Sequence, residues 1–361
     1  MRHKTRLSLL ALTVLAGVGC YELASTTTVF SSARSWTGTG HASIGSTYGK
    51  HSVGLAGQDV LTFDGSGFRY SWTAPAMSVF GGAHVLTSIA QTHSLGFHEH
   101  TFVHGNLAGR TDNLDLLYTY QTNLTALRRV QPSYIRFWEA GTYFNVVEIC
   151  DLTAASLSSY GNPADLESHL FLSFRACPEG GGACAGGVLE VQVDTAISQW
   201  WIRSNQQGTQ VTLRKPDGTR FSNECMPISV TSYGEQSRQY LAVGDPSWDE
   251  LSLFDANRLW EGPLGSLRVA DTTRNIKDVY VEGRGDGSTD YAFLAVLWRG
   301  STSATLEHSV AVNGTFSSDA THLLETVPSD VLFIEGRGLG AEGTSAALYT
   351  YGSRVIQRTY Q

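Results

Sequence analysis

The chain has 361 residues, 38 of them glycine, only 16% are charged, and its formal net charge is −8 at pH 7. The acidic balance argues against nucleic acid or an anionic bilayer face as a partner, because both attract basic surfaces. The low charge and high glycine content argue against long helices and favour many short strands joined by tight turns.

The first segment in chain order has the features of an export signal. A basic head containing Arg2 and Arg6 precedes an apolar run from Leu7 to Val18, which is too short to span a bilayer. The residues Ala16-Gly17-Val18-Gly19-Cys20 resemble the lipobox of bacterial lipoproteins. The resemblance implies cleavage after Gly19 and diacylation of Cys20. The alternative is an ordinary secretory signal with an incidental cysteine.

These features predict three regions and a cellular address. Residues 1–19 are a lipoprotein signal peptide, residues 20–32 a lipidated tether, and residues 33–361 the folded domain. Tyr21 follows the cysteine where Asp would favour retention in the inner membrane, so the outer membrane of the cell envelope is expected. A secreted protein is the other possibility. We expect a monomer that contacts the membrane through its lipid anchor only.

A repeated phrase runs through the rest of the chain: a Gly-rich polar loop, an apolar strand, a turn and a second strand. The last two units match most closely, because Val281-Glu282-Gly283-Arg284-Gly285 recurs as Ile334-Glu335-Gly336-Arg337-Gly338. Units of this length suit a four-stranded propeller blade better than a solenoid coil. The units open at glycines 49, 105, 161, 234, 285 and 338.

This rhythm predicts an all-β fold, a single β-propeller of six blades, with seven as the alternative. The strand-like piece Thr28-Val29-Phe30 precedes the first unit, and the last unit has only two clear strands. We expect the two chain ends to close one blade together, which removes two exposed sheet edges. Large aromatic residues such as Trp298 are expected to pack between blades.

Three stretches resemble degenerate repeats of the FG-GAP/VCBS family. They are Gly105–Leu117, Leu241–Pro246 and Arg284–Val296. The resemblance implies a β-propeller and, in many members, calcium bound by an Asp-rich loop before a strand. Calcium takes six or more oxygen ligands, and most loops here have few carboxylates. Asp286 and Asp290 are the calcium candidates, and an adhesion module with calcium-stiffened loops is the second alternative function.

Four histidines gather between residues 93 and 104: His93, His98, His100 and His104. On a strand, alternate residues share a face, so His98 and His100 would converge on one ion, and His104 would complete three nitrogen ligands if the chain bends at its end. Such a nitrogen set suits Zn²⁺ or Cu²⁺, which makes a metal-dependent enzyme the first alternative function. The other interpretation is a metal-free polar loop at the central channel. Strand alternation turns Glu99 away from these histidines.

Four cysteines follow Cys20, and an even number in an exported chain predicts two disulfides. Cys177 and Cys184 flank a Gly-rich loop, which leaves Cys150 to pair with Cys225. Zinc is the competing interpretation, but no pair has the short spacing of a structural zinc site.

Signatures of nucleophilic catalysis are missing from the sequence. It has no Gly-x-Ser-x-Gly elbow, and no cysteine is left over if both disulfides form. We therefore predict no catalytic residues, and a non-catalytic binding or scaffolding lipoprotein with a protein or glycan as its ligand.

Overall fold

The computed structural model describes strands and turns over most of the second half of the chain and selected strands of the first half. No helix in these ranges is long and apolar enough to cross a membrane. The described residues are 23–31, 52–56, 59–63, 68–73, 84–92, 100–107, 115–120, 128–130, 136–139, 141–159, 162–194, 199–202, 213–215, 217–219, 221, 225–230, 238–247, 250–268, 275–285, 288–300, 302–316, 323–337, 345–350 and 354–360.

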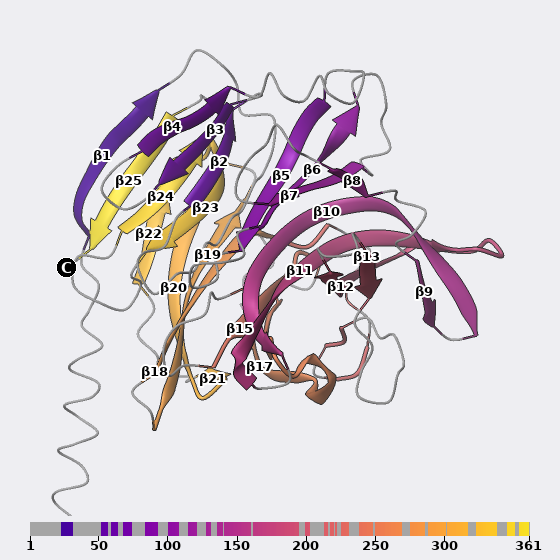
Figure 1. The fold of residues 1–361 in the computed structure, drawn as a ribbon. Helices are drawn as coiled ribbons and strands as arrows, with labels where there is room; N and C mark the ends of the chain where they lie inside the picture. The colour runs from indigo at the N-terminus through magenta and orange to yellow at the C-terminus, as the bar shows by residue number, and fades with distance from the viewer. Residues whose placement is uncertain are drawn as a thin grey trace, which may run out of the picture.

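The described strands form six antiparallel sheets, numbered here 1 to 6 in chain order (Figure 1). Sheet 1 contains β2 (Ser52–Ala56), β3 (Asp59–Phe63) and β4 (Phe68–Thr73). Sheet 2 contains β5 (His84–Thr92), β6 (His100–Leu107), β7 (Asp115–Tyr120) and β8 (Arg128–Val130). Sheet 3 contains β9 (Arg136–Glu139), β10 (Thr142–Ser159), β11 (Asn162–Pro178), β12 (Ala185–Asp194) and β13 (Gln199–Ile202).

The remaining sheets follow the same antiparallel pattern. Sheet 4 contains β14 (Ile228–Val230), β15 (Tyr240–Asp245), β16 (Glu250–Asp255) and β17 (Pro263–Arg268), with a 3₁₀ turn at Leu259–Glu261. Sheet 5 contains β18 (Asn275–Gly285), β19 (Asp290–Arg299), β20 (Ala304–Val312), β21 (Thr315–Phe316) and β22 (Leu323–Val327). Sheet 6 contains β23 (Val331–Arg337), β24 (Ser345–Thr350), β25 (Arg354–Tyr360) and β1 (Leu23–Ser31).

The two chain ends meet in sheet 6. The N-terminal strand β1 pairs antiparallel with the C-terminal strand β25, and Thr28 lies opposite Ile356. This confirms the expectation that both ends complete one sheet. Strand β1 lies within residues 20–32, so the folded part begins earlier than the boundary at residue 33 drawn from the sequence. The pairing removes an edge from each end of the chain.

The sheets follow one another around a closed ring. One strand of each sheet lies on the ring: β2, β5, β10, β14, β18 and β23 each contact the next in this order, and β23 contacts β2. Five sheets therefore begin near the centre with their first strand, sheet 3 does so with its second strand β10, and each continues outward, which is the architecture of a β-propeller.

The inner strands of sheets 4 and 5 bury side chains on both of their faces. In β15, Leu241 and Val243 pack toward sheet 3, whereas Tyr240 and Ala242 pack toward sheet 5. Strand β19 divides its side chains between sheets 4 and 6 in the same way. A sheet covered on both faces needs a nearly continuous apolar run rather than polar alternation. Trp298, which is 2% exposed, lies between sheets 4 and 5 as expected.

A glycine allows sheets 4 and 5 to approach closely. A Cβ added at Gly244 of β15 would lie 2.7 Å from Ile276 Cγ2 and 3.2 Å from Val279 Cγ1, both in β18. This glycine belongs to the stretch Leu241–Pro246, in which the FG-GAP resemblance was noted. The motif glycine therefore has a packing role here.

The sequence placed the start of two units too late, by nearly two strands at Gly105 and by one strand at Gly285. Gly105 lies inside β6, and Gly285 is the last residue of β18. At Gly285, the Gly-rich signal marks the turn between β18 and β19, the first and second strands of sheet 5.

Candidate functional site

The edge strand β14 is joined to sheet 3 through its backbone. Alternate amides at its free edge donate to side chains of the preceding sheet, since the intervening residues pair with β15. The three bonds are Met226 N to Ser173 Oγ at 3.2 Å, Ile228 N to Asp151 Oδ2 at 3.0 Å and Val230 N to Thr153 Oγ1 at 3.1 Å. A buried edge amide without an acceptor would be costly.

The same arrangement recurs between the later sheets. In β18, Val281 N donates to Ser229 Oγ of β14 at 3.2 Å. In β23, Ile334 N donates to Asp278 Oδ2 of β18 at 2.6 Å. Val281 and Ile334 are the corresponding positions of the two matching repeats, so the sequence similarity reflects one structural role. Asp278 is 1% exposed and also accepts from Val279 N at 2.8 Å.

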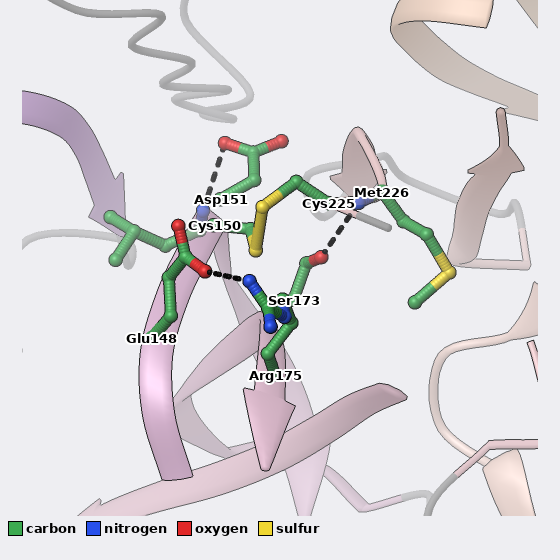
Figure 2. The surroundings of a disulfide bond; sticks show 8 residues. Glu148, Cys150, Asp151, Ser173, Arg175, Cys225 and Met226 are labelled. Carbon is green, nitrogen blue, oxygen red and sulfur yellow. Dashed lines mark hydrogen bonds and ion pairs between the residues drawn. A yellow bond between two sulfur atoms is a disulfide. The ribbon is translucent and has the colours of Figure 1, made fainter. Parts of the chain in front are cut away.

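A disulfide reinforces the boundary between sheets 3 and 4 (Figure 2). It joins Cys150 of β10 to Cys225, three residues before β14. Figure 2 shows Glu148 and Arg175 beside it, with an ion pair of 3.0 Å. One ligand atom each from Glu148, Cys150 and Cys225 lie within 4.8 Å of one another. The two sulfurs are bonded to each other, however, and a disulfide offers no thiolate to a metal.

The second disulfide closes a hairpin tip. Cys177, the second-last residue of β11, is bonded to Cys184, seven residues later. Inside the loop, Gly181 N donates to Pro178 O at 3.0 Å. Both cysteine pairings expected from the sequence are therefore present.

The predicted histidine cluster lies only partly in the described residues. His100 and His104 are in the central strand β6, where His100 is opposite Thr92 and Tyr120, and His104 is opposite Ser88. His93 and His98 lie outside the described residues, as does Cys20. Zinc or copper binding at this cluster stays a prediction.

Of the two calcium candidates, Asp286 lies outside the described residues and Asp290 has protein partners. Asp290 Oδ1 accepts from Arg238 N at 3.0 Å, and Asp290 N donates to Asn313 Oδ1 at 2.9 Å. The carboxylate thus links sheet 5 to the segment before β15. Calcium in this loop stays a prediction.

Two buried pairs of ionisable side chains lie in or beside sheets 3 and 4. Lys215 Nζ lies 2.7 Å from Asp245 Oδ2, with side chains 5% and 0% exposed. Asp245 is the aspartate of the motif stretch in β15, and its Oδ1 also accepts from Ser247 N at 3.1 Å. His169 Nδ1 contacts Glu190 Oε1 within sheet 3, and both side chains are buried. All four side chains thus have structural partners.

A smaller polar group lies at the start of β15. Asp255 Oδ2 lies 3.3 Å from Arg238 Nε, and Asp255 Oδ1 accepts from Asn257 N at 3.0 Å. Burial raises the pKa of the Asp255 carboxyl despite these bonds. Burial likewise raises the pKa of the Tyr240 phenol, with a further contribution from the Asp290 charge.

Sheet 3 extends beyond the ring as an arm, defined here as residues 136–147 and 174–186. Strands β10 and β11 have 18 and 17 residues, whereas the next longest strand has 11. Figure 1 shows the hairpin between β11 and β12, and strand β9, projecting to the right of the body. The extra strand length therefore carries part of the sheet away from its neighbours.

The inner face of the arm is an aromatic cluster. Phe137 stacks on Phe144 with ring centroids 5.4 Å apart, and Phe174 meets Phe137 edge-on at 5.4 Å. All three rings are buried. A Cβ added at Gly187 of β12 would lie 2.8 Å from Phe174 Cζ, so the glycine makes room for this ring. The three packed rings hold strands β9, β10 and β11 of the arm together.

The outer face of the arm carries a second aromatic pair that is exposed. Trp138 and Tyr143 lie directly opposite each other across the β9–β10 hairpin, with centroids 4.7 Å apart and ring planes at 70°. They are 48% and 38% exposed. Within the described residues, three of the four large exposed hydrophobic side chains lie here: Trp138, Tyr143 and Val147.

Reasoning from the sequence missed this pair, although a signal was present. Phe137 and Trp138 precede a turn at Gly141, and Tyr143 and Phe144 follow it. Aromatic residues that occupy successive positions on both strands of a hairpin must cover both of its faces. One aromatic pair therefore had to face away from the core.

Two ion pairs lie at the margin of the arm. Glu139 Oε1 pairs with Arg214 Nη2, and Glu148 Oε2 with Arg175 Nη1. Asn145 is exposed and follows Tyr143 on the same face of β10. The outer face thus combines aromatic rings with a neutral amide.

Comparison with known proteins gives no family for the chain. No protein-family model matches it, and no curated protein matches it. Solved structures similar to it include a fungal lectin from Aleuria aurantia described as a six-bladed β-propeller with a fucose recognition mode. That alignment has 10% identity and a TM-score of 0.49, and covers 92% of this chain and 93% of the lectin.

Two other solved structures are also similar. BBS1N, crystallised in complex with ARL6DN, has 11% identity and a TM-score of 0.43, with 86% of this chain and 75% of that chain covered. An endo-arabinase from Bacteroides thetaiotaomicron has 13% identity and a TM-score of 0.39, with 73% and 88% covered. Because all three TM-scores are below 0.5, the fold assignment rests on sheet topology and strand contacts. These define a β-propeller with an arm projecting from one sheet.

Proposed function

We propose that the protein is a six-bladed β-propeller that acts as a non-catalytic binding scaffold, exported and held at the cell envelope by lipid on Cys20. The observation that carries the proposal is the outer face of the arm, where Trp138 and Tyr143 are exposed. Exposed aromatic side chains that cluster on one surface often mark a binding site, whereas single exposed apolar side chains are common on any protein surface.

The roles of the buried carboxylates support a scaffold rather than an enzyme. Asp151 and Asp278 accept backbone amides of the next sheet, and Asp245 neutralises Lys215. Acid–base catalysis needs a carboxyl group that can reach a substrate, and these groups are buried.

The six sheets around a ring support the number of blades, and the disulfides support export. Cys150–Cys225 and Cys177–Cys184 both lie at least partly toward the surface. Disulfides persist mainly in oxidising compartments outside the cytosol.

The anchor is tested by palmitate labelling and membrane fractionation in a bacterial host. Wild-type protein is expected to incorporate label and sediment with membranes, and Cys20→Ala is expected to lose both properties. Label that persists in Cys20→Ala would exclude lipidation at this residue.

The binding role is tested with purified, folded protein and envelope extract. Wild-type protein is expected to retain envelope components that Trp138→Ala with Tyr143→Ala does not retain. Val312→Ala is a matched control, because Val312 is 38% exposed but lies in β20, away from the arm. Identical retention by all three proteins would exclude the arm as the binding surface.

A further inference from the structure

We infer that the outer face of the arm is a binding site for a neutral saccharide, an inference that rests on the proposed binding function. A sugar ring is amphipathic: its C–H face is apolar and its hydroxyl groups are both donors and acceptors. Trp138 and Tyr143 offer flat apolar surfaces with polar edges. Asn145, on the same side of β10, offers an amide that can donate and accept.

The aromatic pair is held in place before any ligand arrives. Trp138 and Tyr143 are a directly opposed pair of the β9–β10 ladder. On the other side of β10, Glu179 N donates to Tyr143 O at 2.8 Å, just beyond the Cys177–Cys184 disulfide. The buried Phe137–Phe144 stack lies on the inner face of the same two strands. Binding therefore costs little ordering of side chains or backbone.

The described charges of the arm argue against an anionic ligand. The carboxylates of Glu139 and Glu148 are matched by the guanidinium groups of Arg214 and Arg175. Glu179, which is exposed at the tip, adds negative charge that would repel an anionic sugar. The uncharged amide of Asn145 lies on the same face of β10 as Tyr143, where it can both donate to and accept from hydroxyl groups.

The size of the surface favours a small ligand over a protein. A stable protein–protein interface buries about 800 Å² on each partner and involves roughly 20 to 30 residues a side. The outer face of the arm has three exposed large hydrophobic residues, Trp138, Tyr143 and Val147. Its apolar part is therefore suited to one or two sugar rings.

The test uses the full mature protein on a printed panel of neutral and anionic glycans. The neutral glycan with the strongest signal is then titrated by calorimetry. We expect Trp138→Ala to weaken binding at least tenfold, which corresponds to about 1.4 kcal/mol, and Asn145→Ala to weaken it less. Trp138→Phe is expected to retain part of the affinity, because it keeps an aromatic face. Val312→Ala is expected to leave affinity unchanged.

Folding of each variant is checked by its melting temperature, and the exposure of Trp138 makes a large change unexpected. Neutral glycan binding that is equal in wild type and Trp138→Ala would overturn the site, and binding of anionic glycans alone would overturn the ligand class. If the arm retains a protein from envelope extract but no glycan, the saccharide inference fails and the scaffold function stands. If wild type retains neither, both fail.

Discussion

The boundary between sheets 3 and 4 and the boundary between sheets 5 and 6 are built on the same bond. Asp151 Oδ2 accepts from Ile228 N at the first, and Asp278 Oδ2 accepts from Ile334 N at the second. Each aspartate also accepts, through Oδ1, the amide of the residue that follows it. One carboxylate with two acceptor oxygens thus satisfies two edge amides at once.

The two boundaries differ in what is added to this bond. In the described residues, the first has two more side-chain acceptors, Ser173 and Thr153, and the Cys150–Cys225 disulfide. The arm leaves the ring at this boundary. The comparison teaches that a hydrogen-bonded edge suffices between regular sheets, whereas the sheet that carries a projecting arm is also fixed covalently.

The largest expected effect is the loss of this covalent link. Cys150→Ala with Cys225→Ala should lower the free energy of unfolding by about 4 kcal/mol, because the disulfide closes a long loop in the unfolded chain. The two cysteines are 75 residues apart, against 7 for the hairpin disulfide. Removing Cys177–Cys184 in the same way should cost roughly 2.5 kcal/mol. Urea unfolding measures both, and equal losses would break the comparison.

The next effect concerns the hydrogen-bonded boundary. Asp278→Ala should lower the free energy of unfolding by about 3 kcal/mol, since two buried amides lose a charged acceptor. Asp278→Asn should lose less, because its amide oxygen still accepts one of them. Guanidinium unfolding of the three proteins measures the difference. Stability unchanged in Asp278→Ala would show that this carboxylate does not hold the boundary.

The smallest expected effect concerns Asp255. Its carboxylate accepts from Asn257 N, in the turn that follows its own strand, and so contrasts with Asp151 and Asp278, which accept amides of a neighbouring sheet. Burial raises the pKa of Asp255 above its ordinary value of 3.8. A raised pKa in the folded state means that this group contributes stability below pH 3.8, which is lost as the pH rises through the folded pKa. Asp255→Asn should remove this part of the pH dependence. Melting temperatures measured across the acid range test it, and an identical profile in the variant would contradict it.

Some of this structure followed from the sequence because the signals were local or countable. The repeat containing Val281 and Ile334, the two cysteine pairs and the strand near Thr28 all pointed to features that the structure has. The roles of Asp151 and Asp278 could not be predicted, because the sequence does not show whether an aspartate in an apolar strand faces solvent or the edge strand of the neighbouring sheet. The arm was missed because strand length beyond the ring depends on tertiary packing rather than propensity.

The most direct test of the ring is the exchange rate of single edge amides. Hydrogen exchange followed by NMR reports on the amides of Ile228, Val281 and Ile334, which have no strand partner at the free edge. If side chains of the preceding sheet hold them, all three should exchange as slowly as amides within the β15–β16 ladder. Exchange as fast as that of exposed turn amides would contradict the account of how the sheets are joined.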